Sequence, residues 1–438
     1  MSKQMKDSGV SWIGEIPEDW KITKIKYTTK LNGRIGWQGL TSDEYQETGP
    51  YLITGTDFEK GKINFKTAVH IEESRWKEAT QIQVKNGDLL ITKDGTVGKV
   101  AIISGLDDKA SLNSGVLRIQ PIPMIDTKFL YYILISEEFW LWFNFTNSGA
   151  STILHLYQNV FDNFSYVIPS ALMEQKAIAD YLDKQTAKFD QAARLLTDEI
   201  STLRAYKKSL IYETVTKGLD KTASLKDSGV DWIGEIPVGW EVKPIKYIFE
   251  IIGSGSTPKS DREDFYDGEF PWIQSGDLYQ TDKVVKTSKT LTEIGQKSSS
   301  ALTIYKAPFL AIAMYGASIG NLAISKIDAS VNQAVAVLKD DEVKVRFGKY
   351  ALTASKSEII NEGLGGTQPN ISQVLLKGWH LPQPNLTEQK AIADYLDEKT
   401  NKINEIIKIK EQQLTNLSEQ RKAFIYGVVT GKRGHFDK

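Results

Sequence analysis

The sequence predicts an α+β fold in which two tandem α+β domains are joined by two long antiparallel helices (a coiled coil), in a pseudo-twofold and almost circular arrangement. Two repeats and one contrast predict it. One segment occurs at 6–27 as KDSGVSWIGEIPEDWKITKIKY and again at 226–247 as KDSGVDWIGEIPVGWEVKPIKY. Another occurs at 174–190 as EQKAIADYLDKQTAKFD and again at 388–404 as EQKAIADYLDEKTNKIN. The two repeats indicate that the chain is a tandem duplication. The residues between these constant segments have diverged, which suggests that the two halves share a framework and have different targets.

Composition bounds the class of protein. The chain has 438 residues, enough for two domain cores, and its 41% hydrophobic and 25% charged residues are typical of globular proteins. Cysteine is absent, which excludes disulfides, thiolate zinc sites and cysteine nucleophiles. The N-terminus has no apolar export signal and no apolar run reaches about eighteen residues, so we expect a soluble, cytoplasmic protein. The net charge is −1, so any DNA binding is expected to be local or shared with partners.

Each half opens on the repeated segment, whose glycines and prolines indicate irregular backbone rather than helix. We expect its tryptophans to be buried: Trp12 and Trp20, with their copies Trp232 and Trp240. In the diverged regions, short β-branched and aromatic runs predict strands at 88–92, 100–104, 309–313 and 334–338. Residues 129–143 and 349–362 are expected to be helical.

A long helix closes each half, and we expect Ser170 and Thr387 to cap the two N-termini. Apolar residues recur along both helices at coiled-coil spacing, which predicts helices that pack on each other. They are Leu182, Phe189, Leu196, Leu203 and Leu210 in the first helix, and Ile403, Ile407, Leu414, Leu417, Phe424 and Val428 in the second. Three charged residues, Lys207, Lys410 and Arg421, interrupt the two stripes.

Covalent order predicts that the two helices run antiparallel. Roughly 40 helical residues extend about 60 Å, so we expect the domains at opposite ends of a rod and the C-terminal tail close to Lys6. The predicted parts are a first α+β domain at 1–169, a first helical region at 170–220, a second α+β domain at 221–385, and a second helical region at 386–438.

Several motifs in this order resemble a known family. They are the WIGEIP segments, the run from Gly253 to Leu278 that ends in FPWIQSGDL, its diverged counterpart from Gly33 to Phe58, the G-x-x-G-x-x-AI element, and the EQKAIADYLD helix starts. Over essentially the whole chain this pattern resembles the specificity subunit of type I restriction-modification systems.

The resemblance implies a DNA-binding subunit of the restriction system that catalyses nothing itself. Each variable domain would read one half of a bipartite, gapped and asymmetric site in double-stranded DNA. The conserved helices would bind two modification subunits, which carry S-adenosylmethionine and methylate adenine, and restriction subunits would add ATP- and magnesium-dependent translocation and cleavage. No cofactor or metal is expected on this chain.

Base readout favours short polar side chains on glycine-bearing loops, because these offer donors and acceptors to base edges. The first-domain candidates are Arg34, Trp37, Gln38, Thr54, Thr56, Lys93, Asp94, Thr96, Asn113, Ser151 and Thr152. The second-domain candidates are Ser256, Thr257, Lys259, Ser275, Asp277, Tyr315, Ser318, Asn332, Gln333, Thr367 and Gln368. Residues repeated on both helices are candidates for partner binding: Lys176, Asp180, Tyr181, Lys390, Asp394 and Tyr395. Plain turns, capping and solvation are the alternative explanations for many of these residues.

Two other functions compete with DNA specificity. A self-sufficient nuclease or methyltransferase would need motifs that the sequence lacks: Asp88 and Lys93 have no matching partners in the second half, and the GTVGK stretch at 95–99 is too short for a phosphate loop. The histidines, His70, His155, His380 and His435, lack metal-ligand spacing and are expected to be ordinary core or surface residues. A two-headed adaptor that binds proteins or other polymers is the second alternative.

Overall fold

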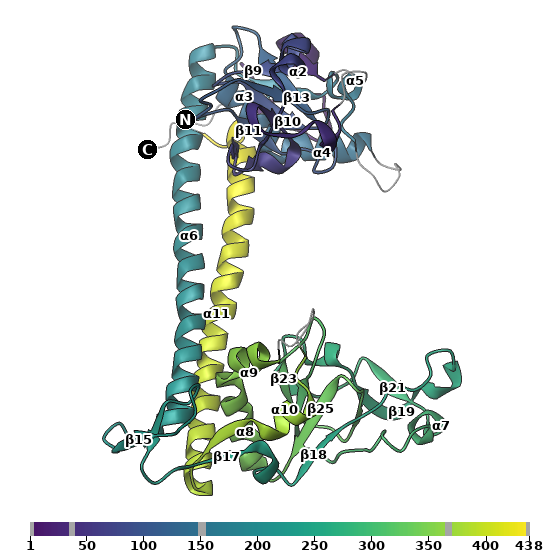
Figure 1. Ribbon diagram of the computed structural model, residues 1–438. Helices are drawn as coiled ribbons and strands as arrows, with labels where there is room; N and C mark the ends of the chain where they lie inside the picture. The colour runs from purple at the N-terminus through teal and green to yellow at the C-terminus, as the bar shows by residue number, and fades with distance from the viewer. Residues whose placement is uncertain (1–3, 35–39, 148–154, 364–369, 435–438) are drawn as a thin grey trace. The chain divides into compact units, whose positions relative to one another are not determined.

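The computed structural model describes residues 4–34, 40–147, 155–363 and 370–434, and the chain divides into two compact units. Unit 1 comprises Met1–Thr197 and Gln412–Lys438, and unit 2 comprises Asp198–Glu411. Each unit therefore holds one diverged region together with a stretch of both long helices, α6 (Leu172–Lys217) and α11 (Leu386–Val429) (Figure 1).

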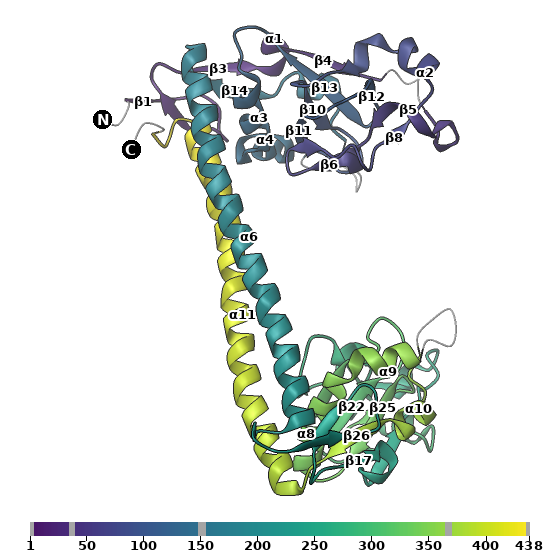
Figure 2. The same cartoon turned by 60° about the vertical axis from the view of Figure 1, so that its left-hand side comes forward.

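Two four-stranded sheets form the diverged region of unit 1 (Figure 2). The first has the order β11 (Val100–Ile102), β10 (Leu89–Thr92), β13 (Val116–Pro121) and β4 (Thr29–Gly33). The second has the order β8 (Val69–His70), β5 (Gln46–Ile53), β12 (Ala110–Leu112) and β9 (Gln83–Val84). Every residue of β10 is buried, as its unbroken apolar run requires. The smaller pairs are β1 (Met5–Asp7) with β2 (Glu15–Pro17), β3 (Lys21–Lys24) with β14 (Ser165–Ile168), and β6 (Phe58–Glu59) with β7 (Lys62–Ile63).

Unit 2 repeats this plan with its own side chains. Its larger sheet has the order β18 (Ile251–Ser254), β25 (Val335–Lys339), β22 (Phe309–Ala313), β23 (Leu322–Ser325) and β20 (Lys283–Val284). Its smaller sheet has the order β21 (Lys289–Leu291), β19 (Tyr266–Ile273) and β24 (Ser330–Val331). The remaining pairs are β15 (Leu225–Asp227) with β16 (Glu235–Pro237) and β17 (Glu241–Pro244) with β26 (His380–Gln383). In each unit the second sheet given contains one parallel pair, β5 with β12 in unit 1 and β19 with β24 in unit 2. The four predicted strands are thus confirmed within one or two residues.

Each predicted helix of the diverged regions is two helices. Residues 129–143 fall in α3 (Thr127–Ile135) and α4 (Glu137–Thr146), separated by Ser136, whose hydroxyl accepts from Glu138 N. Residues 349–362 fall in α8 (Glu342–Ala354) and α9 (Lys356–Glu362), separated by Ser355. A serine breaks the helix in both copies because its hydroxyl competes with the helical hydrogen bonds. The other short helices are α1 (Ile25–Thr28), α2 (Glu73–Glu78), α5 (Gln158–Phe161), α7 (Glu293–Lys297) and α10 (Gln373–Gly378). Short 3-10 turns complete the units: η2 (Ser42–Glu44), η3 (Gly55–Asp57), η4 (Thr80–Ile82), η5 (Ile245–Tyr247), η6 (Glu263–Phe265) and η7 (Ser275–Leu278).

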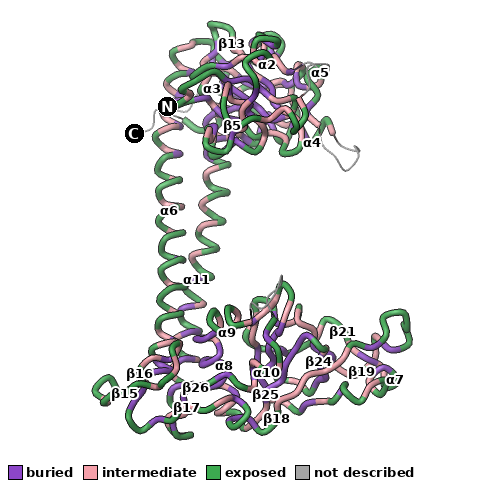
Figure 3. The backbone as a smooth tube through the Cα atoms, viewed as in Figure 1, coloured by how far each residue is buried: buried purple, intermediate pink, exposed green. Residues whose placement is uncertain are grey.

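The two long helices pack antiparallel inside each unit. In unit 1, Phe189 lies against Phe424 with ring centroids 5.7 Å apart. In unit 2, Ile200, Ile403 and Ile407 form a buried cluster. The predicted apolar stripe is therefore the packing face, and Figure 3 marks many of the other residues along both helices as exposed.

The charged residues that interrupt the stripe bond to the other helix. Within unit 2, Lys207 Nζ donates to Asn404 Oδ1 at 2.8 Å and Lys410 Nζ to Glu199 Oε2 at 2.6 Å. Within unit 1, Arg421 Nε lies 3.1 Å from Asp190 Oδ1. These contacts fix the pairing of the helices at little cost, because the charges stay partly in water.

The predicted N-caps were wrong. The Asn385 side chain accepts from Glu388 N at 2.9 Å, so Asn385 caps α11 and Thr387 lies within the helix. The Ser170 hydroxyl instead donates to the Asp19 carbonyl, which ties the start of α6 to the repeated segment.

The repeated segment clamps the long helices in the same way in both units. Trp20 Nε1 donates to Glu174 Oε1 at 3.2 Å in unit 1, and Trp240 Nε1 donates to Glu388 Oε2 at 3.0 Å in unit 2. Both indoles are buried, whereas Trp12 and Trp232 are only partly buried.

The C-terminal end of α11 returns to the N-terminal segment, as predicted. Ile425, Val428 and Val429 belong to the same core as Ile13 and Ile16 in unit 1. The Tyr426 hydroxyl also donates to the Trp12 carbonyl at 3.3 Å. The beginning and the end of the chain are therefore built into one folded unit.

Candidate nucleic-acid interface

Four loops of unit 1 converge at one edge of its two sheets. They follow β5 (residues 54–57), β10 (93–99) and β12 (113–115), and precede α5 (155–157). Lys93 N donates to the Gly115 carbonyl at 2.8 Å, and Leu156 N donates to the Lys93 carbonyl at 2.9 Å. Lys99 Nζ reaches the Gly55 carbonyl at 3.3 Å. Backbone and side-chain bonds thus hold the loops against one another, and we name this group the first loop cluster.

The first loop cluster collects most of the described first-domain candidates. Thr96 is exposed beside Gly55, where an added Cβ would lie 3.4 Å from the Thr96 hydroxyl. Asn113 is half-buried, and its backbone nitrogen donates to the Ile53 carbonyl. Thr54 and Thr56 are joined through their hydroxyls at 2.7 Å. These side chains follow the ends of strands, so the sheets hold the loops in position.

The side chains of Asp94 and His155 meet within this cluster. His155 Nδ1 lies 2.6 Å from Asp94 Oδ1, and about two fifths of each side chain is exposed. The exposed Tyr157 ring lies 5.7 Å from the imidazole, centroid to centroid. His155 was expected to be an ordinary residue, and this pairing was missed because it joins loops far apart in sequence.

Unit 2 carries a second loop cluster on the matching strands. Asn332 N donates to the Ile273 carbonyl at 2.9 Å, and Ile371 N donates to the Met314 carbonyl at 2.8 Å. The Thr257 hydroxyl donates to Gln333 Oε1. The remaining described candidates lie on the same loops or beside them: Ser256, Lys259, Ser275, Tyr315 and Ser318.

The backbone frameworks of the two clusters match, whereas their side chains differ. Leu156 bonds to Lys93 in unit 1 as Ile371 bonds to Met314 in unit 2. This equivalence places Asp94 opposite His155 and Tyr315 opposite Asn370, which form an isolated β-bridge. The repeat framework therefore presents an acid and an imidazole in one unit and a phenol and an amide in the other.

Some candidates have structural partners. Arg34 is buried, with Nε donating to the Leu112 carbonyl at 2.8 Å and a second nitrogen to Ser111 Oγ at 3.0 Å. Burial is the largest influence on Arg34 and lowers the pKa of its guanidinium. Asp277 accepts from Gln274 N at 2.8 Å and Ser288 N at 2.9 Å. Arg34 and Asp277 therefore have structural roles in holding the loops.

Six candidates lie outside the described residues. They are Trp37, Gln38, Ser151, Thr152, Thr367 and Gln368.

Asp88, which the nuclease alternative would place in a metal-dependent site, forms an ion pair. Asp88 Oδ2 lies 2.9 Å from an Arg118 terminal nitrogen, and both side chains are nearly buried. Asp88 also accepts from Lys85 N. Within the ranges that the structure describes, no group of three or more His, Asp or Glu side chains could hold a metal ion. The ion pair with Arg118, a residue of β13, holds Asp88 against the sheet.

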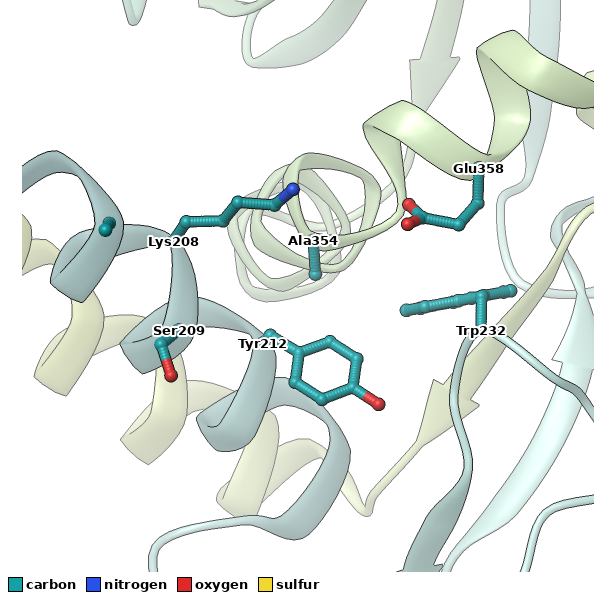
Figure 4. A pocket seen from close by; sticks show the side chains of 7 residues that line it. Lys208, Ser209, Tyr212, Trp232, Ala354 and Glu358 are labelled. Atoms are coloured by element: carbon teal, nitrogen blue, oxygen red, sulfur yellow. The ribbon is translucent and has the colours of Figure 1, made fainter.

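A separate hollow of about 310 Å³ lies in unit 2 (Figure 4). Trp232, Tyr212 and Ala354 line it, with Lys208 and Glu358 at its edges. Because its walls come from α6, the repeated segment and the junction of α8 with α9, it belongs to the constant framework rather than to the loops.

The candidate partner residues divide into two kinds. Lys176, Asp180, Lys390 and Asp394 are exposed, and Lys390 Nζ lies 2.7 Å from Asp394 Oδ2. Arg346 also lies 2.8 Å from Asp394, and the Lys390 and Arg346 hydrogen bonds hold the pKa of the Asp394 carboxyl below its usual value. Tyr181 and Tyr395 are partly buried and pack on the cores of their units.

Two matched loop clusters on one repeated framework define a two-headed recognition protein. The family described as "Type I restriction modification DNA specificity domain" matches residues 17–200 and 237–416. The chain is 27% identical over 434 residues to a Methanocaldococcus jannaschii protein assigned as the specificity subunit of type I restriction enzyme MjaX, covering 96% of this chain and 95% of that protein. It is also 27% identical to the MjaVIII specificity subunit of the same organism, over 95% of this chain and 93% of that one.

Among solved structures, the chain resembles one titled as the structural basis of complex assembly and conformational transition of the type I R-M system. The TM-score is 0.73 at 15% identity, covering 94% of this chain and 98% of that chain. The likeness shows a shared fold.

The chain therefore belongs to the type I restriction-modification specificity family. It is a DNA sequence-specificity subunit, and as such it is not an enzyme. In the part of the chain that the structure describes, no helix is long and apolar enough to cross a membrane.

Proposed function

We propose that the two loop clusters read the two halves of a bipartite, gapped and asymmetric site in double-stranded DNA, one half-site per cluster. The observation that carries this proposal is the matched backbone framework with different side chains at equivalent positions. A shared framework docks on DNA in a shared way, whereas different side chains read different bases. A chain with two such clusters recognises two unlike sequences.

Phosphate contacts fit the charge of the clusters. Lys93 and Lys99 lie in the first cluster and Lys259 in the second. A net charge of −1 over the whole chain leaves much of the phosphate neutralisation to other subunits, because that term dominates nucleic-acid affinity. The chain thus supplies sequence choice, and its partners supply a large share of the affinity.

The partners in this proposal are two modification subunits and, where restriction occurs, restriction subunits. The repeated, exposed faces of α6 and α11 around Lys176 and Lys390 support two equivalent contacts, because identical surfaces bind identical partners. S-adenosylmethionine, ATP and magnesium belong to those partners, and the complex works in the cytoplasm. The gap between half-sites follows the length of the two helices.

Exchange of one diverged region tests the reading model. Residues 241–384 are replaced by the corresponding segment of another specificity subunit, and adenine methylation is mapped in cells that also carry the modification subunit. The expected motif keeps one half-site and changes the other. A change in both half-sites shows that the two clusters do not read independently and refutes the proposal.

Membership of the DNA specificity family decides against the two-headed adaptor that the sequence alone left open.

A further inference from the structure

We propose that His155, oriented by Asp94, reads one base in the half-site of the first loop cluster, and that Asn370 occupies the equivalent reading position in the second. This inference rests on the proposed DNA-reading function and names the residues that give each half-site part of its identity. It begins from a geometric observation, because the two positions share their backbone setting and differ in chemistry.

In each unit, the residue lies where the loops of its own cluster meet. The residue after His155 bonds to the Lys93 carbonyl, and the residue after Asn370 bonds to the Met314 carbonyl. Gly115 closes the first cluster on the other side, since an added Cβ there would lie 3.6 Å from the Asp94 Cβ. Asp94 is thus enclosed by two neighbouring loops while its carboxylate stays partly open to water.

Asp94 determines which imidazole nitrogen is available. An ionised carboxylate can only accept, so the 2.6 Å contact requires the proton on His155 Nδ1. In the neutral ring, Nε2 then carries a lone pair and accepts a hydrogen bond. Among the described residues, the contacts of the His155 ring are the Nδ1 bond to Asp94 and the neighbouring Tyr157 ring.

An acceptor at this point selects the base edges that donate. In the major groove these are the amino groups of adenine and cytosine, whereas guanine and thymine present acceptors. The Tyr157 ring lies beside the imidazole, and about two fifths of the His155 side chain is exposed. The first cluster is therefore expected to select an amino-bearing base at one position of its half-site.

Asn370 gives the second cluster a different preference. Its side chain is exposed, and its backbone is held by the bridge to Tyr315 and by a bond to the Gly363 carbonyl. A side-chain amide offers a donor and an acceptor together, the pattern that pairs with adenine. The two equivalent positions thus contribute different base preferences to an asymmetric DNA site.

The test maps adenine methylation in cells that carry the full chain with its modification subunit. The variants are His155→Ala, His155→Gln, Asp94→Asn and Asn370→Ala. His155→Ala is expected to relax one base position by about fivefold, the loss of about 1 kcal/mol of a single hydrogen bond, and to leave the other half-site unchanged. Asn370→Ala, the matched control, is expected to relax the other half-site only.

Asp94→Asn distinguishes orientation from a merely structural role. The amide can donate to Nδ1, which moves the ring proton to Nε2 and turns the reading atom from acceptor to donor. The expected result is a shift from adenine or cytosine towards guanine or thymine at the same position. A structural role alone would lower methylation at all sites equally.

Failure of the proposed function and failure of the His155 contact give different results. If the unaltered chain yields no two-part motif, the proposed function fails. If it yields the motif and both His155 variants, folded by circular dichroism, keep every base preference, this inference is overturned while the proposed function stands. Should His155→Ala fail to fold, His155→Gln decides, because its side chain keeps a polar group of similar reach.

Discussion

A buried carboxyl in unit 1 predicts how the stability of the protein depends on pH. Glu138, in the first turn of α4, is fully buried. Its Oε1 accepts from Val167 N at 3.2 Å, and among the described atoms its Oε2 has no hydrogen-bond partner. Burial raises the pKa of the Glu138 carboxyl to about 8, against a smaller opposing influence of the Val167 hydrogen bond and the Lys432 charge.

The sign of the effect follows from linkage. The folded pKa lies above the unfolded value, so the stabilising contribution is complete below about pH 4.5 and declines until the pH passes the folded value of about 8. At pH 7 the unfolded carboxyl is ionised and the folded one is mostly protonated. Between about pH 4.5 and pH 7, an interval of about 2.5 pH units, this contribution to the free energy of unfolding falls by about 3 kcal/mol.

Replacing Glu138 by Gln removes this titration with little change in shape. We expect Glu138→Gln to melt about 6 to 12 °C higher than the unaltered protein at pH 7, and the difference to shrink towards pH 4.5. Glu137→Gln is the matched control, because it removes a charge from the same helical turn at an exposed position. Thermal unfolding followed by circular dichroism from pH 4.5 to 9 measures all three proteins. A Glu138→Gln curve parallel to that of the unaltered protein would refute the reasoning.

Two further predictions concern packing. Gly255→Ala is expected to unfold the second loop cluster, because a Cβ there would lie 1.6 Å from the Val331 carbonyl oxygen. Gly276→Ala is the control: a Cβ at Gly276 would meet open space, so this variant should change the melting temperature little. Equal melting temperatures of the two variants would contradict the prediction. Trp240→Phe should cost about 1 kcal/mol in chemical denaturation by removing the Glu388 hydrogen bond, and an unchanged midpoint would show that this bond is dispensable.

Helix length makes a prediction about the recognised DNA. Adding one helical turn to both α6 and α11, about 5.4 Å, should lengthen the unread gap by one or two base pairs of about 3.4 Å each. Methylation mapping measures the gap, and an unchanged gap would contradict a rigid spacer.

The sequence predicts the parts of this fold that repeat. The duplicated WIGEIP segment and helix start predict the shared framework, and alternating or unbroken apolar runs predict strands such as β22. The helix breaks at Ser136 and Ser355 were missed because the flanking apolar residues continue on both sides, whereas the break depends on local hydrogen bonds of the serine hydroxyl. The capping role of Asn385 was missed because Thr387, two residues later, is also a good capping residue, and only the backbone geometry decides between the two.

Site residues were harder to predict, since they depend on which loops meet. Arg34 looked like a base reader and lies beneath the loops, bonded to Leu112 and Ser111. His155 looked ordinary and meets Asp94 at the surface. Aligning the two halves at Leu156 and Ile371 would have brought His155 and Asn370 together as equivalent positions. The internal repeat therefore held a signal that the single residues did not.

The central claim is that this chain gives a modification complex a two-part DNA target. Adenine methylation mapped across the genome by long-read sequencing tests it most directly, in cells carrying the chain with its modification subunit and in cells lacking the chain. The account predicts a gapped, asymmetric two-part motif that disappears with the chain. Methylation without such a motif, or no methylation although the protein is expressed and bound to its modification subunit, would contradict it.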